Sequence, residues 1–386
     1  LPRHLASATW ALATSRIRHS VLLQELYVAG LEKALDFNAQ DCANSMWSLA
    51  TLQADSPELM SALCASALQN IGSFKPQEVS GTIWALATLS VEHLHLTEAL
   101  SLAASEKSDR FKSQELANTM WSLARMRIHH LGRLGGLAAR AHGILPQFKA
   151  QELANTIWAL AQLKAKDLEL TSSLFAAMPE KAHDFSPQNL SNAMWSMSVL
   201  QYDAPLGALA MAAYGAVPQF EAQALSNSLW ALATLREDAP ELTGMLCLAT
   251  LSKLEAFTAQ GLANTLWAVA TLGIEGEELV EAIAVASLRR VGSFNAQGIG
   301  NTFWALATLH AGSLQSSELL AALCSAAQAP IWGFNAQNLA NTLWALATLH
   351  VDAPGLARAL CTAALRQAQE LNQQNIVTMA WALATL

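Results

Sequence analysis

The chain has 386 residues, of which 53% are apolar and 13% are charged. This composition supports a large buried core and excludes a mainly disordered chain. The net charge of −8 excludes the globally basic surface that favours non-specific binding to nucleic acid, so any such binding must be local.

Tryptophan recurs along the whole chain at a nearly constant period. A Phe or Leu lies ten residues before each Trp from Trp47 on, and a Gln lies seven residues before it. The full motif F-x-(A/P)-Q-x-L-(A/S)-N-(S/T)-φ-W-(A/S)-L-A-T-L, with φ apolar, spans Phe334 to Leu349. Such a recurrence predicts a solenoid, in which similar units build one continuous core. Spacings of 35, 37 or 40 residues separate Trp10, Trp47, Trp84, Trp121, Trp158, Trp195, Trp230, Trp267, Trp304, Trp344 and Trp381, and only Trp332 lies outside the series.

Each repeat predicts two helices. The first spans about residues 39 to 52 in the repeat of Trp47, with Asn38 as its N-cap. The second begins at Pro57 after a polar turn and carries Leu59 and Leu63 at helical spacing; Pro205, Pro240 and Pro354 hold the place of Pro57 elsewhere. No stretch shows the period-two alternation of a strand. We therefore predict an all-α fold, a right-handed α-solenoid (superhelix) of antiparallel helix pairs with about eleven 37-residue repeats, forming a single domain over residues 1–386 with a truncated repeat at each end.

The first helix has chemically distinct faces. At 100° per residue, Gln40, Asn44, Trp47 and Thr51 form one stripe. An apolar face opposite this stripe carries Cys42, Ala43, Met46, Leu49 and Ala50, and the sector between them carries Asp41, Ser45 and Ser48.

Within the motif, only the position of Asp41 changes freely from repeat to repeat. A variable side chain on a constant scaffold predicts the position that discriminates among ligand units. The series reads Asp41, Glu78, Glu115, Glu152, Asn189, Ala224, Gly261, Gly298, Asn338 and Asn375.

An Asn lies three residues before most of the periodic Trp residues. One interpretation is structural: the carboxamide bonds backbone groups at the seam between repeats, because buried polar groups must be satisfied. The other is direct contact with a ligand. The Trp series has two interpretations as well, core packing and stacking on bases. The Asn series comprises Asn44, Asn118, Asn155, Asn192, Asn227, Asn264, Asn301 and Asn341.

Positive charge is concentrated between Lys107 and Lys166, where the net charge is +7 against −15 for the rest of the chain. Lys75, Lys112 and Lys149 occupy one position in three successive repeats and predict a ladder for phosphates, extended by Arg125. Alternatively, this is a solvated face that Glu78, Glu115 and Glu152 neutralise. The basic residues of the segment are Lys107, Arg110, Lys112, Arg125, Arg127, Arg133, Arg140, Lys149, Lys164 and Lys166.

No catalytic signature is visible. His129 and His130 lack a metal-binding partner, and no Gly-rich phosphate loop is present. We expect no enzyme activity, no metal, no cofactor and no small-molecule substrate. We read the five cysteines as small buried hydrophobes. A membrane span is not expected either, because Pro330 and Gly333 interrupt the uncharged stretch 319–351.

The motif resembles the heptatricopeptide and octotricopeptide repeat families, relatives of the pentatricopeptide repeats. It is also similar to the helical-repeat domain named after a subunit of the kinetoplastid RNA-editing substrate-binding complex. The resemblance covers essentially the whole chain and implies an organellar RNA-binding protein of mitochondria or plastids, acting in RNA processing, stability, editing or ribosome assembly.

We therefore expect single-stranded RNA on a concave face lined by the first helices, at about one nucleotide per repeat. The Asp41 and Asn44 series would contact bases, and Lys75, Lys112, Lys149 and Arg125 would hold phosphates. The expected partners are single-stranded RNA and other proteins of a ribonucleoprotein complex. The alternative is a protein-interaction scaffold without RNA contact, similar to the armadillo groove, where amides hold an extended peptide.

Overall fold

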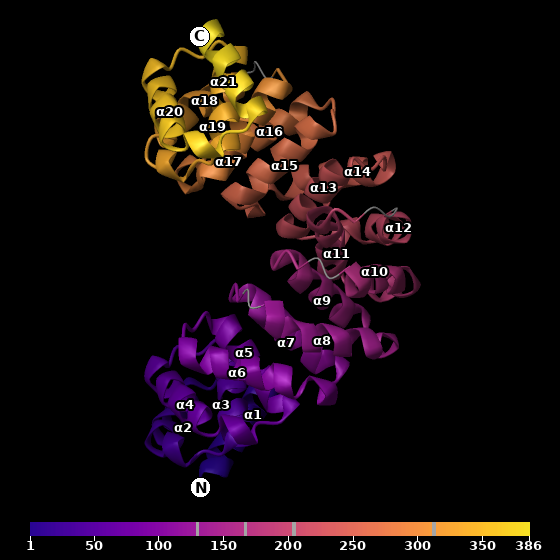
Figure 1. Cartoon of the computed structure of the whole chain (residues 1–386), viewed down its shortest axis with the longest axis vertical. Coiled ribbons are helices and arrows are strands. Elements are labelled where there is room, and N and C mark those ends of the chain that lie inside the picture. The colour runs from indigo at the N-terminus through magenta and orange to yellow at the C-terminus, as the bar shows by residue number, and fades with distance from the viewer. Residues whose placement is uncertain (129–130, 166–167, 203–205, 311–313) are drawn as a thin grey trace. The chain divides into compact units, whose positions relative to one another are not determined.

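The computed structural model describes residues 1–128, 131–165, 168–202, 206–310 and 314–386 (Figure 1). His129, His130, Lys166 and Pro205, which entered the sequence arguments, lie outside the described residues, as does the side chain of Arg133. The described part consists of α-helices and short 3-10 turns and contains no strand, which confirms the all-α prediction. None of its helices has the length and apolar character needed to cross a membrane.

Ten repeats contain both expected helices, here called the first and the second helix, and the last repeat contains a first helix. The first helices are α1 (Pro2–Thr14), α3 (Ala39–Leu52), α5 (Pro76–Leu89), α7 (Ser113–Arg125), α9 (Ala150–Gln162), α11 (Pro187–Leu200), α13 (Ala222–Leu235), α15 (Ala259–Thr271), α17 (Ala296–Thr308), α19 (Ala336–Thr348) and α21 (Gln373–Thr385). The second helices are α2 (Ser20–Lys33), α4 (Pro57–Gln69), α6 (Leu94–Glu106), α8 (Leu131–Gly143), α10 (Leu168–Ala177), α12 (Gly207–Ala216), α14 (Pro240–Lys253), α16 (Glu277–Leu288), α18 (Leu314–Ala326) and α20 (Pro354–Arg366).

A 3-10 turn, which the sequence analysis did not predict, joins each second helix to the next first helix. After every turn but the last, the next residue is the periodic Phe, and it is buried: Phe74 is 2% exposed and Phe111 is 0% exposed. The residue after the last turn is Leu371, which is half-buried. These turns are η1 (Ala34–Asp36), η2 (Ile71–Ser73), η3 (Ser108–Arg110), η4 (Leu145–Gln147), η5 (Pro179–Asp184), η6 (Val217–Gln219), η7 (Leu254–Ala256), η8 (Val291–Ser293), η9 (Ile331–Gly333) and η10 (Ala368–Glu370).

The first helices begin where their capping residues predict. The side-chain oxygen of Asn38 accepts a hydrogen bond from the backbone N–H of Asp41 at 3.0 Å, and Ser186 and Thr258 cap α11 and α15 in the same way. Pro76 and Pro187 occupy the first turn of α5 and α11, where a missing N–H costs nothing.

The chain forms two compact bodies, residues 1–185 (the N-terminal body) and 186–386 (the C-terminal body). In the N-terminal body the first helices α1, α3, α5, α7 and α9 pack side by side in chain order. In the C-terminal body the first helices α11, α13, α15, α17, α19 and α21 do the same. Contacts between neighbouring first helices are more extensive than those between neighbouring second helices. Small residues on the first helices, such as Ala43 and Ser45, permit this close approach, and both are buried.

Candidate functional site

A polar stripe is the part of each first helix that its neighbours leave uncovered. It consists of Gln40, Asn44, Trp47 and Thr51 in α3 and of the equivalent residues in the other first helices. Gln40 is exposed, whereas Asn44, Trp47 and Thr51 are half-buried. The equivalent Gln is exposed in every repeat from that of Trp47 on, and the Asn series is half-buried throughout. Since consecutive first helices pack side by side within each body, the stripe continues from helix to helix.

The carboxamides of the Asn series make no hydrogen bond to another described residue, whereas several Ser and Thr side chains of the first helices bond to their own backbone. Ser48, for example, donates to the carbonyl of Asn44 at 2.6 Å, whereas the carboxamide of Asn44 has no hydrogen bond within the described part of the chain. The same holds for the other seven members of the series. The expected seam interpretation therefore lacks its hydrogen bonds, and each carboxamide keeps two donors and one acceptor available to solvent or a ligand.

The Asp41 series occupies a different place from the expected one. Asp41 is 5% exposed, Glu152 is 8% and Asn338 is 6%, so the expectation that this position lies open for base contact is wrong for them. Their side chains complete capping boxes: a carboxylate oxygen of Glu152 accepts from the backbone N–H of Lys149 at 2.9 Å. The sector of Asp41 is covered because a first helix packs against a neighbour on both sides as well as against its own second helix. In the other members of the series, Glu78, Glu115 and Gly261 are half-buried, whereas Asn189, Ala224, Gly298 and Asn375 are buried.

Neighbouring Trp rings of the polar stripe touch one another. The ring centroids of Trp47 and Trp84 are 6.3 Å apart with an interplanar angle of 33°, and those of Trp121 and Trp158 are 6.2 Å apart at 32°. These distances lie in the range of directly contacting aromatic pairs, so no base fits between two rings. Packing is thus the role that the geometry supports for the series. Trp332, outside the series, lies 4.1 Å from the guanidinium of Arg366.

Several Thr residues at the end of the stripe bond back into their own helix, whereas the buried hydroxyls of Thr51, Thr88 and Thr348 have no hydrogen-bond partner among the described residues. The hydroxyl of Thr234 donates to the carbonyl of Trp230 at 2.8 Å, and Thr271 and Thr308 do the same with Trp267 and Trp304. Arg125 replaces Thr in α7. Its Nε donates to the carbonyl of Ala87 in α5 at 2.9 Å, and its guanidinium lies 5.4 Å from the ring centre of Trp121.

The predicted lysine ladder occupies the N-caps of α5, α7 and α9. Lys75, Lys112 and Lys149 are exposed, and no ion pair joins them to another described residue. Glu78 and Glu115 accept from the backbone N–H groups of Lys75 and Lys112, at 2.6 and 2.9 Å, rather than pairing with the ammonium groups. These carboxylates therefore form no ion pair with the lysine ladder among the described residues.

Other basic residues of the 107–166 segment have structural partners. Lys107 donates through Nζ to the carbonyl of Phe74 at 2.6 Å, and Nε of Arg140 donates to the carbonyl of Phe111 at 3.2 Å. The same bridge to the Phe carbonyl of the preceding repeat is made by Asn70, Lys181, Lys253 and Gln367. Sequence reasoning missed this bridge, although a polar or basic residue 33 positions after each of these Phe residues except Phe111 is its signal.

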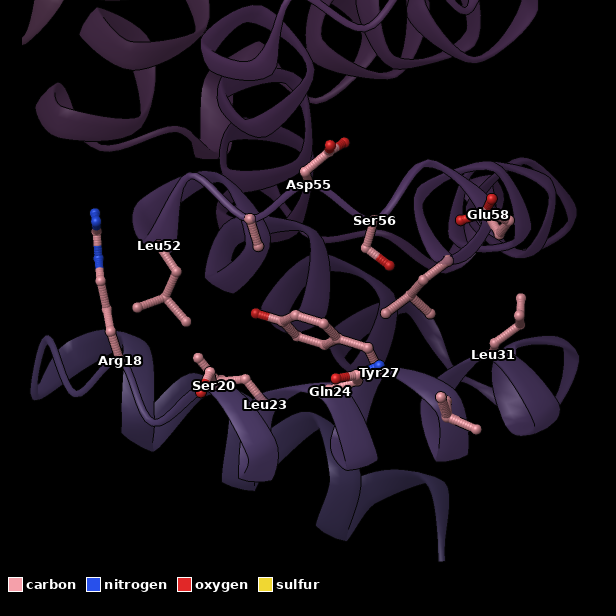
Figure 2. A pocket seen from close by; sticks show the side chains of 13 residues that line it. Arg18, Ser20, Leu23, Gln24, Tyr27, Leu31, Leu52, Asp55, Ser56 and Glu58 are labelled. Carbon is pink, nitrogen blue, oxygen red and sulfur yellow. The ribbon is translucent and has the colours of Figure 1, made fainter.

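A hollow in the N-terminal body is lined mainly by α2 and by the turn between α3 and α4. It has a volume of about 580 Å³ and is lined by Leu23, Tyr27 and Leu59, among others. Figure 2 shows the ring of Tyr27 across the middle of this hollow, with Asp55 and Ser56 above it and Arg18 at one end. Burial raises the pKa of Tyr27. Among the described residues, no group of His, Cys, Asp and Glu is arranged to hold a metal ion.

The cysteines are free thiols, of which Cys42 and Cys64 are buried and the other three are half-buried. Burial raises the pKa of Cys42, Cys64 and Cys247 to about 11, so these thiols stay protonated at neutral pH. A protonated thiol is a weak nucleophile.

Stacked helix pairs with one uncovered polar stripe define an α-solenoid repeat protein. Comparison with known protein families narrows this class to one family. The family model of the RNA-editing substrate-binding complex 6 protein matches residues 2–168, 181–315 and 239–386, and the chain belongs to this family. A second model, of a protein of unknown function (DUF1601), matches residues 162–194.

The remaining comparisons are weak. No curated protein matches the chain in sequence. Among solved structures, a chain of a homology model of the full-length AP-3 complex in an intermediate open conformation is similar, at 10% identity and a TM-score of 0.31, over 98% of this chain and 79% of that chain. A likeness of this strength says nothing about function.

Proposed function

We propose that the protein is an RNA-binding subunit of an RNA-editing ribonucleoprotein and that it holds single-stranded RNA along the polar stripes of its first helices. The observation that carries this proposal is the Asn series. A half-buried carboxamide without an internal hydrogen bond, present in eight of the eleven first helices, supplies the donors and acceptor that pair with base edges.

The polar stripe suits a single strand better than a duplex. Bases of a single strand are splayed out and offer their Watson–Crick and Hoogsteen edges, which the carboxamides of residues such as Asn227 and Asn264 can reach one repeat at a time. The exposed Gln one turn before each Asn adds a second amide per repeat. The Asp41 series is mostly covered, and six of its ten members complete capping boxes, so base contact falls to the Asn and Gln positions.

Family membership supports the setting of this function. The family is named after a component of an RNA-editing substrate-binding complex, and RNA-editing complexes of kinetoplastids are mitochondrial. We therefore place this protein in the mitochondrion, with other proteins of such a complex as partners; nothing supports a plastid. A closer relation to the heptatricopeptide and octotricopeptide families stays a prediction.

The test replaces three consecutive members of the Asn series in the C-terminal body. The variant Asn227→Ala/Asn264→Ala/Asn301→Ala removes three carboxamides, each worth about 1 kcal/mol as a neutral hydrogen bond. Binding of a labelled twelve-nucleotide single-stranded RNA, measured by fluorescence anisotropy, should weaken about a hundredfold. The control Gln69→Ala/Gln219→Ala/Gln328→Ala removes three exposed amides outside the first helices and should leave the affinity unchanged.

The alternative function, a protein-interaction scaffold, predicts protein binding without RNA binding. If the wild-type chain does not bind the RNA, and partner proteins stay bound to it after ribonuclease treatment, the polar stripe serves a peptide instead. The net charge of −8 favours this second function, because an acidic chain repels the RNA backbone. Equal RNA affinity of the Asn variant and the wild type would also refute the proposed stripe.

A further inference from the structure

Nearly every first helix is followed by a residue in the left-handed backbone conformation. The φ angle of these residues lies between 48° and 64°. Glycine is the usual residue at this position, because a side chain there costs about 1 kcal/mol. Yet Gly273 is the only glycine among the described members of the series, which are Arg16, Gln53, Ser90, Arg127, Lys164, Gln201, Arg236, Gly273, His310 and His350.

In the N-terminal body this position is largely cationic. Arg16, Arg127 and Lys164 are exposed, and none of them forms an ion pair or a hydrogen bond through its side chain with another described residue. Arg18 and Arg125 lie within two residues of the series. Against these five cations, the described turns after α1, α3, α5, α7 and α9 contain two carboxylates, Asp55 and Glu92.

Favourable interaction with the C-terminal end of a helix dipole would also select cations here. That effect acts on every first helix alike, whereas the charge differs between the two bodies. In the C-terminal body, Glu237 and Asp238 directly follow Arg236, and Gly273 is followed by Glu275. The dipole therefore does not account for the basic turns of the N-terminal body alone.

A cavity at the start of this row combines the cations with other ligand-binding groups. Its volume is about 460 Å³, and it is lined by Arg16, Arg18, Thr51, Trp84 and Thr88, with Ala50, Leu52 and Gln53 completing the wall. The hydroxyl oxygens of Thr51 and Thr88 are buried and have no hydrogen-bond partner. The cavity thus offers two guanidinium groups and an indole ring, the groups that bind a phosphate next to a base.

Arg125 extends the row at α7 with a preset orientation. Its hydrogen bond to the carbonyl of Ala87 and its position over Trp121 fix the guanidinium beside the Trp series. A fixed guanidinium loses less side-chain entropy on binding a phosphate than a free one does.

We propose that the C-terminal ends of the first helices in the N-terminal body form a phosphate-binding row, made of Arg16, Arg18, Arg125, Arg127 and Lys164, and that the cavity beside Trp84 is one nucleotide subsite of it. This inference rests on the proposed function and adds the course of the RNA backbone. It places the phosphates at the opposite end of the first helices from Lys75, Lys112 and Lys149.

The left-handed backbone makes a clean test available, because glycine fits that conformation without strain. The variant Arg16→Gly/Arg127→Gly/Lys164→Gly removes three charges and favours folding. Its matched control, Ser90→Gly/Gln201→Gly/His350→Gly, removes three uncharged or weakly charged side chains at the same structural position. A third variant, Lys75→Gln/Lys112→Gln/Lys149→Gln, removes the ladder at the other helix end.

Binding of a single-stranded RNA twelve-mer is measured for each variant at several salt concentrations. For the first variant we expect at least about tenfold weaker binding at 0.1 M salt and a decrease of about 2 in the slope of log K against log salt, since each lost phosphate contact removes about 0.7. The control should keep the wild-type slope. If the first variant binds as the wild type does, or only the lysine variant loses slope, the phosphate row is refuted while the proposed function stands. If the wild type itself binds no RNA, both fail.

Discussion

The indole rings of Trp230 and Trp267 lie 6.3 Å apart at an angle of 37°, although 37 residues separate them in the sequence. The pair joins α13 to α15 beside the unpaired carboxamides of Asn227 and Asn264. Each of the two rings also contacts the Trp ring of the repeat on its other side. Such a ring therefore holds neighbouring repeats together and is also part of the candidate RNA surface.

Replacing one ring should therefore reduce stability first. Trp267 contacts Trp230 and Trp304, so Trp267→Ala removes two ring contacts and leaves a partly exposed gap. We expect a loss of about 2–3 kcal/mol in the free energy of unfolding, below the 3–5 kcal/mol of a fully buried ring. Urea denaturation followed by circular dichroism measures it. Trp267→Phe should restore much of the loss, and an unchanged midpoint in Trp267→Ala would contradict the packing role.

The Asn series should behave oppositely in stability. The variant Asn227→Ala/Asn264→Ala/Asn301→Ala breaks no internal hydrogen bond and places a better helix former at three positions. Its melting temperature should equal or exceed that of the wild type. A fall of several degrees would revive the seam interpretation, in which these side chains lock neighbouring repeats together.

The bridges to the Phe carbonyls should be structural only. Nζ of Lys253 donates to the carbonyls of Phe220 and Pro218, at 2.6 and 3.2 Å. Lys253→Met leaves these carbonyls without that donor, and we expect a cost of about 1–2 kcal/mol in the free energy of unfolding. Lys75→Met is the control, because the exposed Lys75 makes no such bond, and its stability should not change. Equal effects of the two variants would show that the bridge contributes nothing.

The capping role of Glu152 can be separated from the base recognition expected from the sequence. Glu152→Ala removes the hydrogen bond to the N–H of Lys149 and should destabilise the protein by about 1 kcal/mol. The variant should rank oligonucleotides of different sequence by affinity in the same order as the wild type does. If competition titrations showed that Glu152→Ala prefers different RNA sequences from the wild type, the Asp41 series would have to contact bases.

The buried thiols make stability depend on alkaline pH. Burial raises the pKa of Cys42 and Cys64 from 9.0 to about 11, so the folded chain holds these protons more tightly than the unfolded chain. Their contribution to stability is complete below pH 9 and is lost as the pH rises toward about 11. Denaturation midpoints of the wild type should fall over this range more than those of Cys42→Ala/Cys64→Ala. Parallel pH profiles would contradict this assignment.

The helices were predictable because their signals are local. Asn38, Pro57 and Pro76 mark helix starts by the capping chemistry of single residues, and the spacing of Leu59 and Leu63 gives the buried side of α4. Helical angles, however, do not tell which sectors neighbours cover. The sector of Asp41 was therefore expected to be open, although close packing of first helices on both sides buries it.

Two further features of the structure were missed. The bridge from Lys107 to Phe74 crosses 33 residues, and the left-handed conformation of Arg16 and Arg127 depends on how the chain leaves a helix. Neither is visible in the periodicity of one motif. The Asn series was recognised from the sequence, but only the structure shows that its carboxamides lack internal partners.

The most direct measurement is ultraviolet cross-linking of the wild-type chain to a uniformly labelled single-stranded RNA, with the cross-linked peptides identified by mass spectrometry. The account predicts adducts on first-helix peptides around the polar stripe, such as those containing Trp121, Trp158, Trp230 and Trp267, and at the turns that follow these helices. Adducts confined to second helices such as α4, α14 and α20, or none at RNA concentrations that saturate binding, would contradict it.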